Sequence, residues 1–238
     1  MKPYYEHAGI TIYHGDCREV LPQLLQDSVD LLVTDPPYGV KWESNYRTIS
    51  FGGIAGDESA EAAIAGTGLA LRVLRRGRHA YIFGRFDMSS LGLPESAELI
   101  WDKDLLGMGD LSSPWAVSHE YIQFYSSRRS DANVADGRGR LAARMRRGSV
   151  LRSNRANGAA VRHPSEKPVD ILCELIESSS CRGEVVLDYF SGVGSTLVAA
   201  ALERRKAIGI EIEERYCEIA AKRLSQEVFE FPNEKVTA

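Results

Sequence analysis

The sequence of 238 residues is poor in cysteine, with only Cys17, Cys173, Cys181 and Cys217. None of them forms a Cys-x-x-Cys pair, and no cluster of cysteine and histidine has the spacing of a zinc site. A chain of this length can bury a sizeable core without a disulfide or metal staple. We therefore predict no metal site, and free thiols in a reducing, cytoplasmic setting.

A long apolar run is missing from the start of the sequence. It opens MKPYYEHAGITIYHGD, in which charged, polar and glycine residues interrupt every hydrophobic stretch. A secretory signal has an apolar stretch of about 7–15 residues, and a membrane helix needs about 20. We predict neither feature, and no membrane partner.

The chain as a whole has no excess of positive charge, since its formal net charge is −4. That average disfavours nucleic-acid binding, but the charge is unevenly distributed. Residues 126–162 hold ten arginines and two aspartates, which gives this segment +8 and leaves −12 for the remainder. A basic segment on an acidic body indicates a polyanionic partner. Its Ser/Arg/Gly/Asn composition lacks a clear period and predicts a loop-like insert.

Short apolar runs alternate with helical patterns along most of the chain. Stripes at helical spacing follow Pro168 and span Tyr216 to Leu224, and residues 196–205 are rich in alanine and leucine. A further helix is predicted over about 60–74, although its two glycines disfavour it. Alternating strands and helices predict an α/β fold, a mostly parallel sheet covered on both faces. The predicted strands are 10–13, 29–33, 79–83, 120–125, 185–187 and 206–210.

The segment Asp35-Pro36-Pro37-Tyr38 follows one of these strands. The prolines fix φ at about −65° and end strand pairing, and Pro36 keeps Asp35 out of the helical region. The predicted result is a rigid turn at the sheet edge. It holds a carboxylate, a carbonyl group and an aromatic ring together.

Such a turn suits methylation of an amino nitrogen that is conjugated to a ring and is therefore a poor nucleophile. The Asp35 carboxylate and the Pro36 carbonyl can accept its two N–H bonds. This draws the nitrogen toward tetrahedral geometry and frees its lone pair. Tyr38 can stack on the ring. The competing interpretation is a structural Pro-Pro turn in which the aspartate and tyrosine have no chemical role.

A strand, a glycine loop and a helix follow one another over 185–196, VVLDYFSGVGST. The glycines allow close backbone approach to a ligand, and the next helix's N–H groups favour a negative group. The third glycine of a dinucleotide site is missing, and so is the Gly-Lys-Ser/Thr of a P-loop. Glu211, 23 residues after Asp188, can bind ribose hydroxyls. A nucleoside-containing cofactor is predicted, against the competing interpretation of a structural turn beside a solvated glutamate.

These motifs resemble those of the beta class of DNA amino-methyltransferases, the N6-adenine and N4-cytosine enzymes. In that class the D-P-P-Y motif precedes the cofactor loop, and here Asp35 precedes the loop by about 150 residues. The order is more informative than either motif, because most other amino-methyltransferases carry the loop first. The resemblance implies a Rossmann-like, S-adenosylmethionine-dependent methyltransferase fold with helices on both faces of a mostly parallel seven-stranded sheet. It further implies circularly permuted motifs and a single domain over 1–238, with the basic insert at about 126–162.

Further matches extend over nearly the whole chain. Gly15-Asp16-Cys17 resembles the segment that contacts the cofactor's adenine, and residues 163–168, HPSEKP, resemble the segment beside its methionine end. Residues 99–103 and 120–124 resemble later segments of the family's sheet.

The resemblance also implies roles for single residues. Asp188 would hold the cofactor's amino group, Phe190 would pack nearby, and Glu211 would bind the ribose hydroxyls. The implied catalytic residues are Asp35, Pro36, Pro37 and Tyr38. The implied S-adenosylmethionine site comprises Asp16, Cys17, Asp35, Lys167, Asp188, Phe190, Ser191, Gly192, Gly194, Ser195, Thr196, Glu211 and Ile212.

The loop departs from the family's usual D-P-F-x-G-S-G-T-T at several positions. Tyr189 replaces the proline and Val193 replaces the second serine, while both glycines and Thr196 remain. The departures bear on the fine positioning of the loop more than on cofactor binding.

The activity that the resemblance implies is site-specific methylation of adenine N6 in double-stranded DNA, with the base flipped out of the helix. D-P-P-Y is commoner in adenine enzymes and S-P-P-Y in cytosine-N4 enzymes, so cytosine N4 is the second candidate target. Two further hypotheses are an RNA or protein amino-methyltransferase and a non-catalytic nucleic-acid-binding module.

The arginine-rich segment lies where the family places its target-recognition region. Arginine suits both phosphate contacts and guanine readout. The segment is short, which suggests a short target, loose specificity or a homodimer that completes the site. A cognate restriction endonuclease is a further candidate partner. The candidate DNA-binding residues are Arg128, Arg129, Arg138, Arg140, Arg144, Arg146, Arg147, Arg152 and Arg155.

Overall fold

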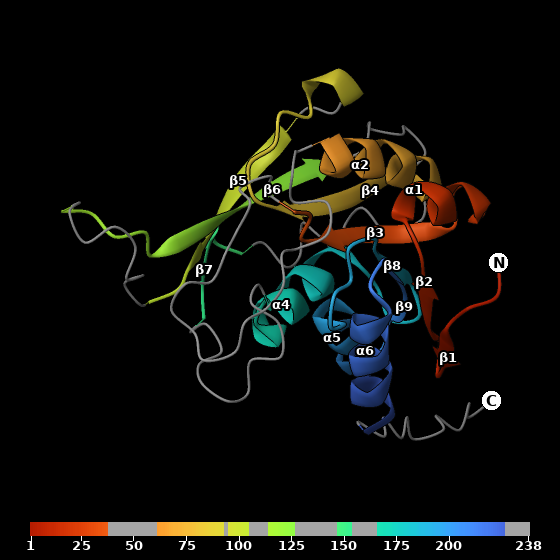
Figure 1. Ribbon diagram of the computed structural model, residues 1–238. Helices are drawn as coiled ribbons and strands as arrows, with labels where there is room; N and C mark the ends of the chain where they lie inside the picture. The colour runs from red at the N-terminus through yellow and green to blue at the C-terminus, as the bar shows by residue number, and fades with distance from the viewer. Residues whose placement is uncertain (38–60, 93–94, 105–113, 127–146, 154–165, 227–238) are drawn as a thin grey trace, which may run out of the picture.

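The computed structural model describes residues 1–37, 61–92, 95–104, 114–126, 147–153 and 166–226. Over these ranges a single nine-stranded sheet runs through the protein, with helices on both of its faces (Figure 1). The order of the strands is β1-β2-β9-β8-β3-β4-β6-β5-β7. Their bounds are β1 Tyr5–His7, β2 Ile10–His14, β3 Val29–Thr34, β4 Leu74–Phe83, β5 Glu95–Asp102, β6 His119–Ser126, β7 Val150–Arg152, β8 Val185–Asp188 and β9 Lys206–Glu211.

Parallel pairing joins β2, β9, β8, β3 and β4, and it also joins β5 to β7. Among the described strands, only β1 with β2, and β6 with β4 and β5, pair antiparallel. The mostly parallel sheet and all six predicted strands are therefore confirmed. The predicted number of seven strands is wrong for the described part of the chain, because the three-residue strands β1 and β7 extend the two edges.

Strand β7 also corrects the prediction of an insert without regular structure. Ile100 of β5 pairs with Val150, and Asp102 pairs with Arg152, inside the arginine-rich segment. Three residues carry too little periodicity to be recognised as a strand, and β7 forms because β5 offers it an open edge. The rest of the insert, 127–146 and 154–162, lies outside the described residues.

The predicted helices are all present. They divide between the faces, with α1 and α2 on one side and α4, α5 and α6 on the other (Figure 1). Among the described helices, none is long and apolar enough to cross a membrane. Their bounds are α1 Cys17–Val20, α2 Glu61–Val73, α4 Val169–Ser179, α5 Ser195–Leu202 and α6 Glu214–Gln226.

Alternation along β3 supplies both layers of the core. Leu31 and Val33 pack with α4, α5 and α6, while Leu32 packs with α1 and α2. Val29 lies on the same face as Leu32 because the register of β3 shifts between Val29 and Leu31. Successive strand residues point to opposite faces, so a strand covered on both faces is apolar at nearly every position. All six residues of β3 are buried, which explains why its sequence is continuous rather than alternating.

The chain leaves β8 and β3 in opposite directions across the sheet. From β8 it continues to β9 on one side, and from β3 it continues to β4 on the other. The helices that follow these two strands, α5 and α2, accordingly cover opposite faces. Such a reversal leaves a crevice at the carboxyl ends of the two strands, which is where open α/β sheets bind their ligands.

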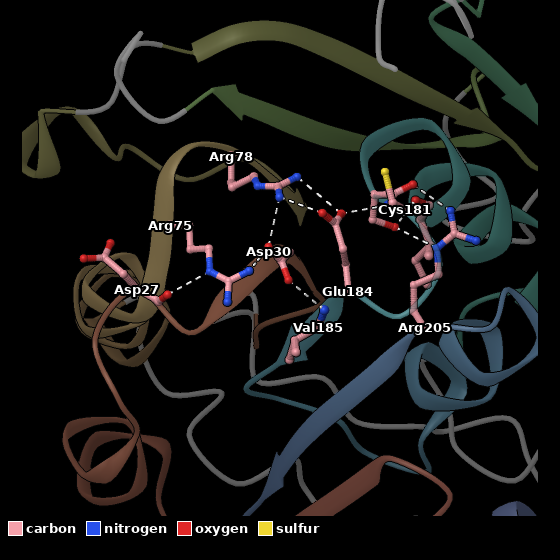
Figure 2. A network of polar contacts seen from close by, with 10 residues as sticks. Asp27, Asp30, Arg75, Arg78, Cys181, Glu184, Val185 and Arg205 are labelled. Carbon is pink, nitrogen blue, oxygen red and sulfur yellow. Dashed lines mark hydrogen bonds and ion pairs between the residues drawn. The ribbon is translucent and has the colours of Figure 1, made fainter. Parts of the chain in front are cut away.

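A charged network closes the opposite, amino-terminal edge of the sheet (Figure 2). Asp30, only 1% exposed within β3, accepts hydrogen bonds from Arg75 at 2.5 Å and from Arg78 at 3.0 Å. It also accepts the Val185 N–H at 3.0 Å, and Arg78 pairs with Glu184 at 2.7 Å. A carboxylate inside a strand is costly unless it is fully paired. Here it ties β3, β4 and β8 together.

We expect Asp30→Ala to lower the free energy of unfolding by about 3 kcal/mol, because it leaves Arg78 and the Val185 N–H short of an acceptor. The lower end of the range for broken buried pairs applies, since Arg75 is partly exposed and can turn toward water. Urea unfolding measures the change. The exposed pair of Lys222 and Glu218 on α6 offers a control, and Glu218→Ala should leave the midpoint unchanged. Equal effects of the two substitutions would contradict the structural role of Asp30.

Candidate active site

Two strand ends that are far apart in the sequence meet at the carboxyl edge of the sheet. β3 and β8 pair in parallel with Leu32 opposite Leu187. Just beyond that pair, the Thr34 hydroxyl donates a hydrogen bond of 2.9 Å to Asp188 Oδ1. Asp35 follows Thr34 directly, so the proline turn and the glycine loop begin side by side.

The proline turn holds Asp35 at the end of a buried strand. Pro36 is buried, while Asp35 and Pro37 are half-buried. The ammonium group of Lys167, from the segment before α4, forms a hydrogen bond and ion pair with Asp35 Oδ2. The structure thus brings together two predicted site residues that lie 132 positions apart. Tyr38, the fourth residue of the motif, lies outside the described residues.

Asp188, the last residue of β8, is a buried carboxyl group with several donors around it. Burial raises its pKa to about 6. Hydrogen bonds from the side chains of Thr196 and Thr34 and from the Phe190 N–H oppose the rise, and the negative charge of Asp35 adds to it. Near neutral pH the group is therefore an anion that is poorly compensated by its surroundings. A cation bound at this point would be stabilised.

The two loop glycines share a left-handed φ but differ in their surroundings. Gly194 begins α5 with φ +79°, and a Cβ there would lie 2.9 Å from the Cβ of Ala220. Gly192 has φ +49°, and no atom of the described residues lies within 4 Å of the position its Cβ would take. Packing therefore fixes the first, whereas the second faces open space. That open space is available to a ligand.

Glu211 lies beside the glycine loop, at the end of β9. Its Oε2 accepts the Gly192 N–H and its Oε1 accepts the Glu213 N–H, each at 2.8 Å. Burial raises the pKa of this carboxyl group, and the two backbone hydrogen bonds oppose the rise. Each oxygen retains a second lone pair, so ribose hydroxyls could still donate to it.

The segment predicted to contact adenine lies next to Glu211. The Gly15 N–H donates to the Glu211 carbonyl oxygen at 2.9 Å, which joins the ends of β2 and β9. Asp16 caps α1 by accepting the Arg18 N–H at 2.8 Å, and it pairs with the Arg18 guanidinium. Cys17 is buried, and burial raises the pKa of its thiol to about 11. Their adenine contact stays a prediction.

Ser195 has other partners than the predicted cofactor. Its hydroxyl donates to Glu166 Oε1 at 3.3 Å and accepts from Arg223 at 3.0 Å. Arg223, on α6, pairs with the same Glu166 oxygen at 2.9 Å and donates to the Val193 carbonyl at 3.2 Å. The cluster ties the glycine loop to α6 and to the segment before α4. These contacts fix the position of the loop.

Three further residues of the predicted cofactor site differ in how far they are exposed. Phe190 is half-buried, and its ring centroid lies 5.1 Å from that of Tyr189. Ser191 turns inward, where its hydroxyl donates to the Ile210 carbonyl at 3.2 Å. Ile212 is 48% exposed. Within the described residues, no group of three His, Cys, Asp or Glu side chains could hold a metal ion.

A family model described as DNA methylase matches residues 29–222, which include both motifs and the strands that hold them. The chain belongs to the N6/N4 DNA methylase family. Its members are DNA amino-methyltransferases, which modify adenine N6 or cytosine N4. The resemblance seen in the sequence is thereby confirmed.

The chain is similar to known proteins over most of its length. YubD of Escherichia coli K12 is 30% identical over 220 residues, which span 89% of this chain and 88% of YubD. TTHA0409 from Thermus thermophilus, solved in complex with S-adenosyl-L-methionine, is 25% identical with a TM-score of 0.64, covering 92% of this chain and 96% of its own. The cytosine-N4-specific PvuII DNA methyltransferase shares the fold, with 17% identity and a TM-score of 0.67, covering 93% and 88%.

The tyrosine that replaces the proline usual in this family packs closely against α2. Tyr189 is 1% exposed and packs on α2, where its hydroxyl lies 2.7 Å from Thr67 Oγ1. A Cβ at Gly66 would lie 3.0 Å from the ring. The glycine that disfavoured the helix in the sequence is therefore the one that admits the ring. The glycine at position 66 therefore accommodates the tyrosine at position 189.

The two described arginines of the predicted DNA-binding set differ in their surroundings. Arg147 pairs with Glu174 at 3.0 Å and with Glu177, both on α4. Arg152, at the end of β7, has a side chain that is 78% exposed and lies 3.4 Å from Asp102. Since β5 and β7 run parallel to β4, Arg152 lies at the same edge of the sheet as Asp35. The other predicted arginines lie outside the described residues: Arg128, Arg129, Arg138, Arg140, Arg144, Arg146 and Arg155.

Sequence reasoning missed four residues that organise the site. Thr34, Glu120, Glu166 and Arg223 each bind a motif residue or its partner. Glu120 carried one usable signal, because a carboxylate inside an apolar strand needs a reason. Glu166 lies in the matched segment HPSEKP, although the resemblance gave it no role of its own. Thr34 and Arg223 carried no signal, because a threonine that ends a strand and an arginine on a helix are common.

We expect Gly66→Ala to destabilise the protein by about 1–2 kcal/mol, because the added methyl group meets a ring that cannot move away. The neighbouring Gly68→Ala is the matched control, since its methyl group would meet only Leu91 Cδ2 at 3.2 Å. Leu91 is half-buried and can shift, so the gain in helix propensity should stabilise the protein by up to about 1 kcal/mol. A lower urea midpoint for Gly66→Ala and a higher one for Gly68→Ala would support the packing of Tyr189. Two stabilised variants would refute it.

Proposed function

We propose that this DNA amino-methyltransferase uses S-adenosylmethionine to methylate adenine N6 in double-stranded DNA. The observation that carries the proposal is the hydrogen bond between Thr34 and Asp188. This hydrogen bond holds the rigid turn of Asp35 and Pro36 beside the buried Asp188. It also places that turn next to the glycine loop, where Gly192 has no described atom close to it. The proline turn can bind an amino group, and Asp188 with the glycine loop can bind a nucleoside that has a cationic end.

The residues present fit S-adenosylmethionine. Its amino and sulfonium groups are cations, and Asp188 offers a buried anion that lacks an ammonium partner among its described contacts. Glu211 offers carboxylate oxygens for ribose hydroxyls, and Gly192 leaves room for close approach. When bound, the cofactor supplies a methyl group whose bond to sulfur breaks with both electrons left on sulfur, while the nitrogen lone pair forms the new bond and the surplus proton leaves to water.

The protein's own task is to prepare the amino group. The Asp35 carboxylate and the Pro36 carbonyl accept its two N–H bonds, and the prolines keep these acceptors from turning away. Because the target lies inside the duplex, the base must first leave the stack. Arg152, exposed at the same edge, is suited to contact the DNA backbone.

Aspartate at the first position of the motif supports adenine as the target, because serine is the commoner residue there in cytosine-N4 enzymes. The fold is neutral on this point, since a cytosine-N4-specific enzyme shares it. A homodimer that completes the short recognition region, and a cognate restriction endonuclease, are further proposals.

The direct test is expression in a host without adenine methylation, followed by sequencing that reads modified bases. We expect N6-methyladenine at one short motif, and a loss of about 10²–10⁴-fold in methylation rate for Asp35→Ala. Marks on cytosine N4 would keep the mechanism and overturn the choice of base. No marks from a folded, cofactor-binding protein would overturn the DNA substrate.

A second prediction concerns cofactor affinity and pH. The pKa of Asp188 is raised to about 6, so the group is ionised above that pH and protonated below it. A cationic ligand needs the ionised form, so the dissociation constant for S-adenosylmethionine should rise about tenfold between pH 7.5 and pH 5. Calorimetric titration measures it. Asp188→Asn should bind weakly, with most of the pH dependence gone. An affinity that stays constant over this range would contradict the role of Asp188.

A further inference from the structure

The ends of β3 and β4 and the start of β6 lie around the ammonium group of Lys167. Asp35 follows β3, Phe83 ends β4, and Glu120 lies near the start of β6. The Lys167 Nζ binds Asp35 Oδ2, lies 3.4 Å from Glu120 Oε2 and lies 5.2 Å from the centre of the Phe83 ring. Beyond Glu120, Lys103 pairs with the other carboxylate oxygen at 2.6 Å. Positive and negative groups therefore alternate from Lys103 to Asp35.

The Lys167 side chain is only 6% exposed, so its charge must be balanced locally. Burial alone would lower the pKa of the ammonium group, but Asp35 and Glu120 outweigh it and raise that pKa. The lysine is therefore a cation near neutral pH. A permanently charged partner keeps a neighbouring carboxyl group in its ionised form.

The residue before Lys167 faces the other half of the site. Glu166 pairs with Arg223 and accepts from Ser195 behind the glycine loop, while Lys167 pairs with the proline turn. Two adjacent residues of opposite charge thus fix the cofactor loop and the catalytic turn to the start of one helix, α4. A shift of either half would have to break a buried ion pair.

We propose that Lys167 is a positioning residue for methyl transfer, which holds the Asp35 carboxylate ionised and oriented toward the amino group of the target base, with Glu120 setting the strength of that hold. A carboxylate has about four acceptor sites on its two oxygens, so the lysine does not use up its capacity. The lysine also makes Asp35 a weaker base. Asp35 then aligns the amino group before transfer instead of removing its proton. The proposal rests on the proposed function.

This role differs from the cofactor contact that the sequence resemblance implied for Lys167. A lysine that bound the cofactor would govern its affinity. A positioning lysine governs the rate of transfer and the pH at which Asp35 becomes protonated. Among the described residues, the charged groups that face Asp35 are Lys167 before α4, Glu120 of β6 beyond the lysine, and Asp188 of β8.

The first experiment needs no cofactor and no DNA. Carbon-13 NMR follows the titration of the Asp35 carboxyl group in the free protein, with Asp35→Asn to assign its signal. Lys167→Gln removes the cation and should move the midpoint up by about 1–3 pH units. Glu120→Gln removes an anion and should move it down by less. Shifts of opposite sign support the proposal, because a merely structural lysine would not produce them, and an unchanged midpoint in Lys167→Gln overturns it.

The second experiment separates rate from affinity. In Lys167→Gln we expect kcat to fall about 10²-fold, with its acidic limb moved to higher pH, while the dissociation constant for S-adenosylmethionine changes less than about threefold. Lys167→Arg keeps the charge and should return the acidic limb to its wild-type position. Lys222→Gln, on the exposed face of α6, is the control and should match the wild type.

The outcomes are distinguishable. A wild-type protein that methylates neither adenine nor cytosine would refute the proposed function, while the NMR titration would still test the coupling of Lys167 to Asp35. A wild-type protein that methylates DNA, with Lys167→Gln weak in cofactor binding but normal in kcat, would refute the positioning role. Circular dichroism of each variant shows that it is folded before these comparisons are made.

Discussion

The parallel pairing of β3 with β8 is the constraint on which the site depends. It brings Asp35 and Asp188 to adjacent strand ends, although they are about 150 positions apart in the sequence. The hydrogen bond from Thr34 to Asp188 forms only in this register. A slip by one residue would turn both side chains to the opposite faces of the sheet. The chain also reverses direction across the sheet at this pair, which is the position at which open α/β sheets bind ligands.

Buried carboxylates at the amino ends and at the carboxyl ends of the strands have opposite surroundings. At the amino edge, Asp30 is enclosed by two arginines and a backbone N–H, and the network stabilises the fold (Figure 2). At the carboxyl edge, Asp188 is buried with neutral donors, and its raised pKa records the cost. A native protein accepts such a cost where a ligand relieves it, since sites for ligands are often less stable than they could be.

Rigid connections between the two halves of the site come from residues outside the motifs. Glu166 and Lys167 bind opposite halves from adjacent positions, and Tyr189 fixes the start of the loop against α2. Transfer of a methyl group is sensitive to small displacements, because reacting atoms must be aligned before reaction. The departure of Tyr189 from the family pattern is tolerated because Gly66 provides the space for its ring.

The sequence by itself determined the six strands and four helices that have clear periods, the order of the motifs and so the family, and the identity of Asp35, Asp188 and Glu211 as candidate site residues. The strands, the helices and the proline turn follow from local chemistry, because prolines restrict φ and burial dictates the spacing of apolar residues. The family and the role expected of Asp188 come from the resemblance of the motifs and their order. Only the tertiary structure decided strand β7 and the partners of Lys167. Three residues form a strand only beside an existing edge. A lysine's contacts depend on which strand ends surround it, and here one of them lies 132 positions away.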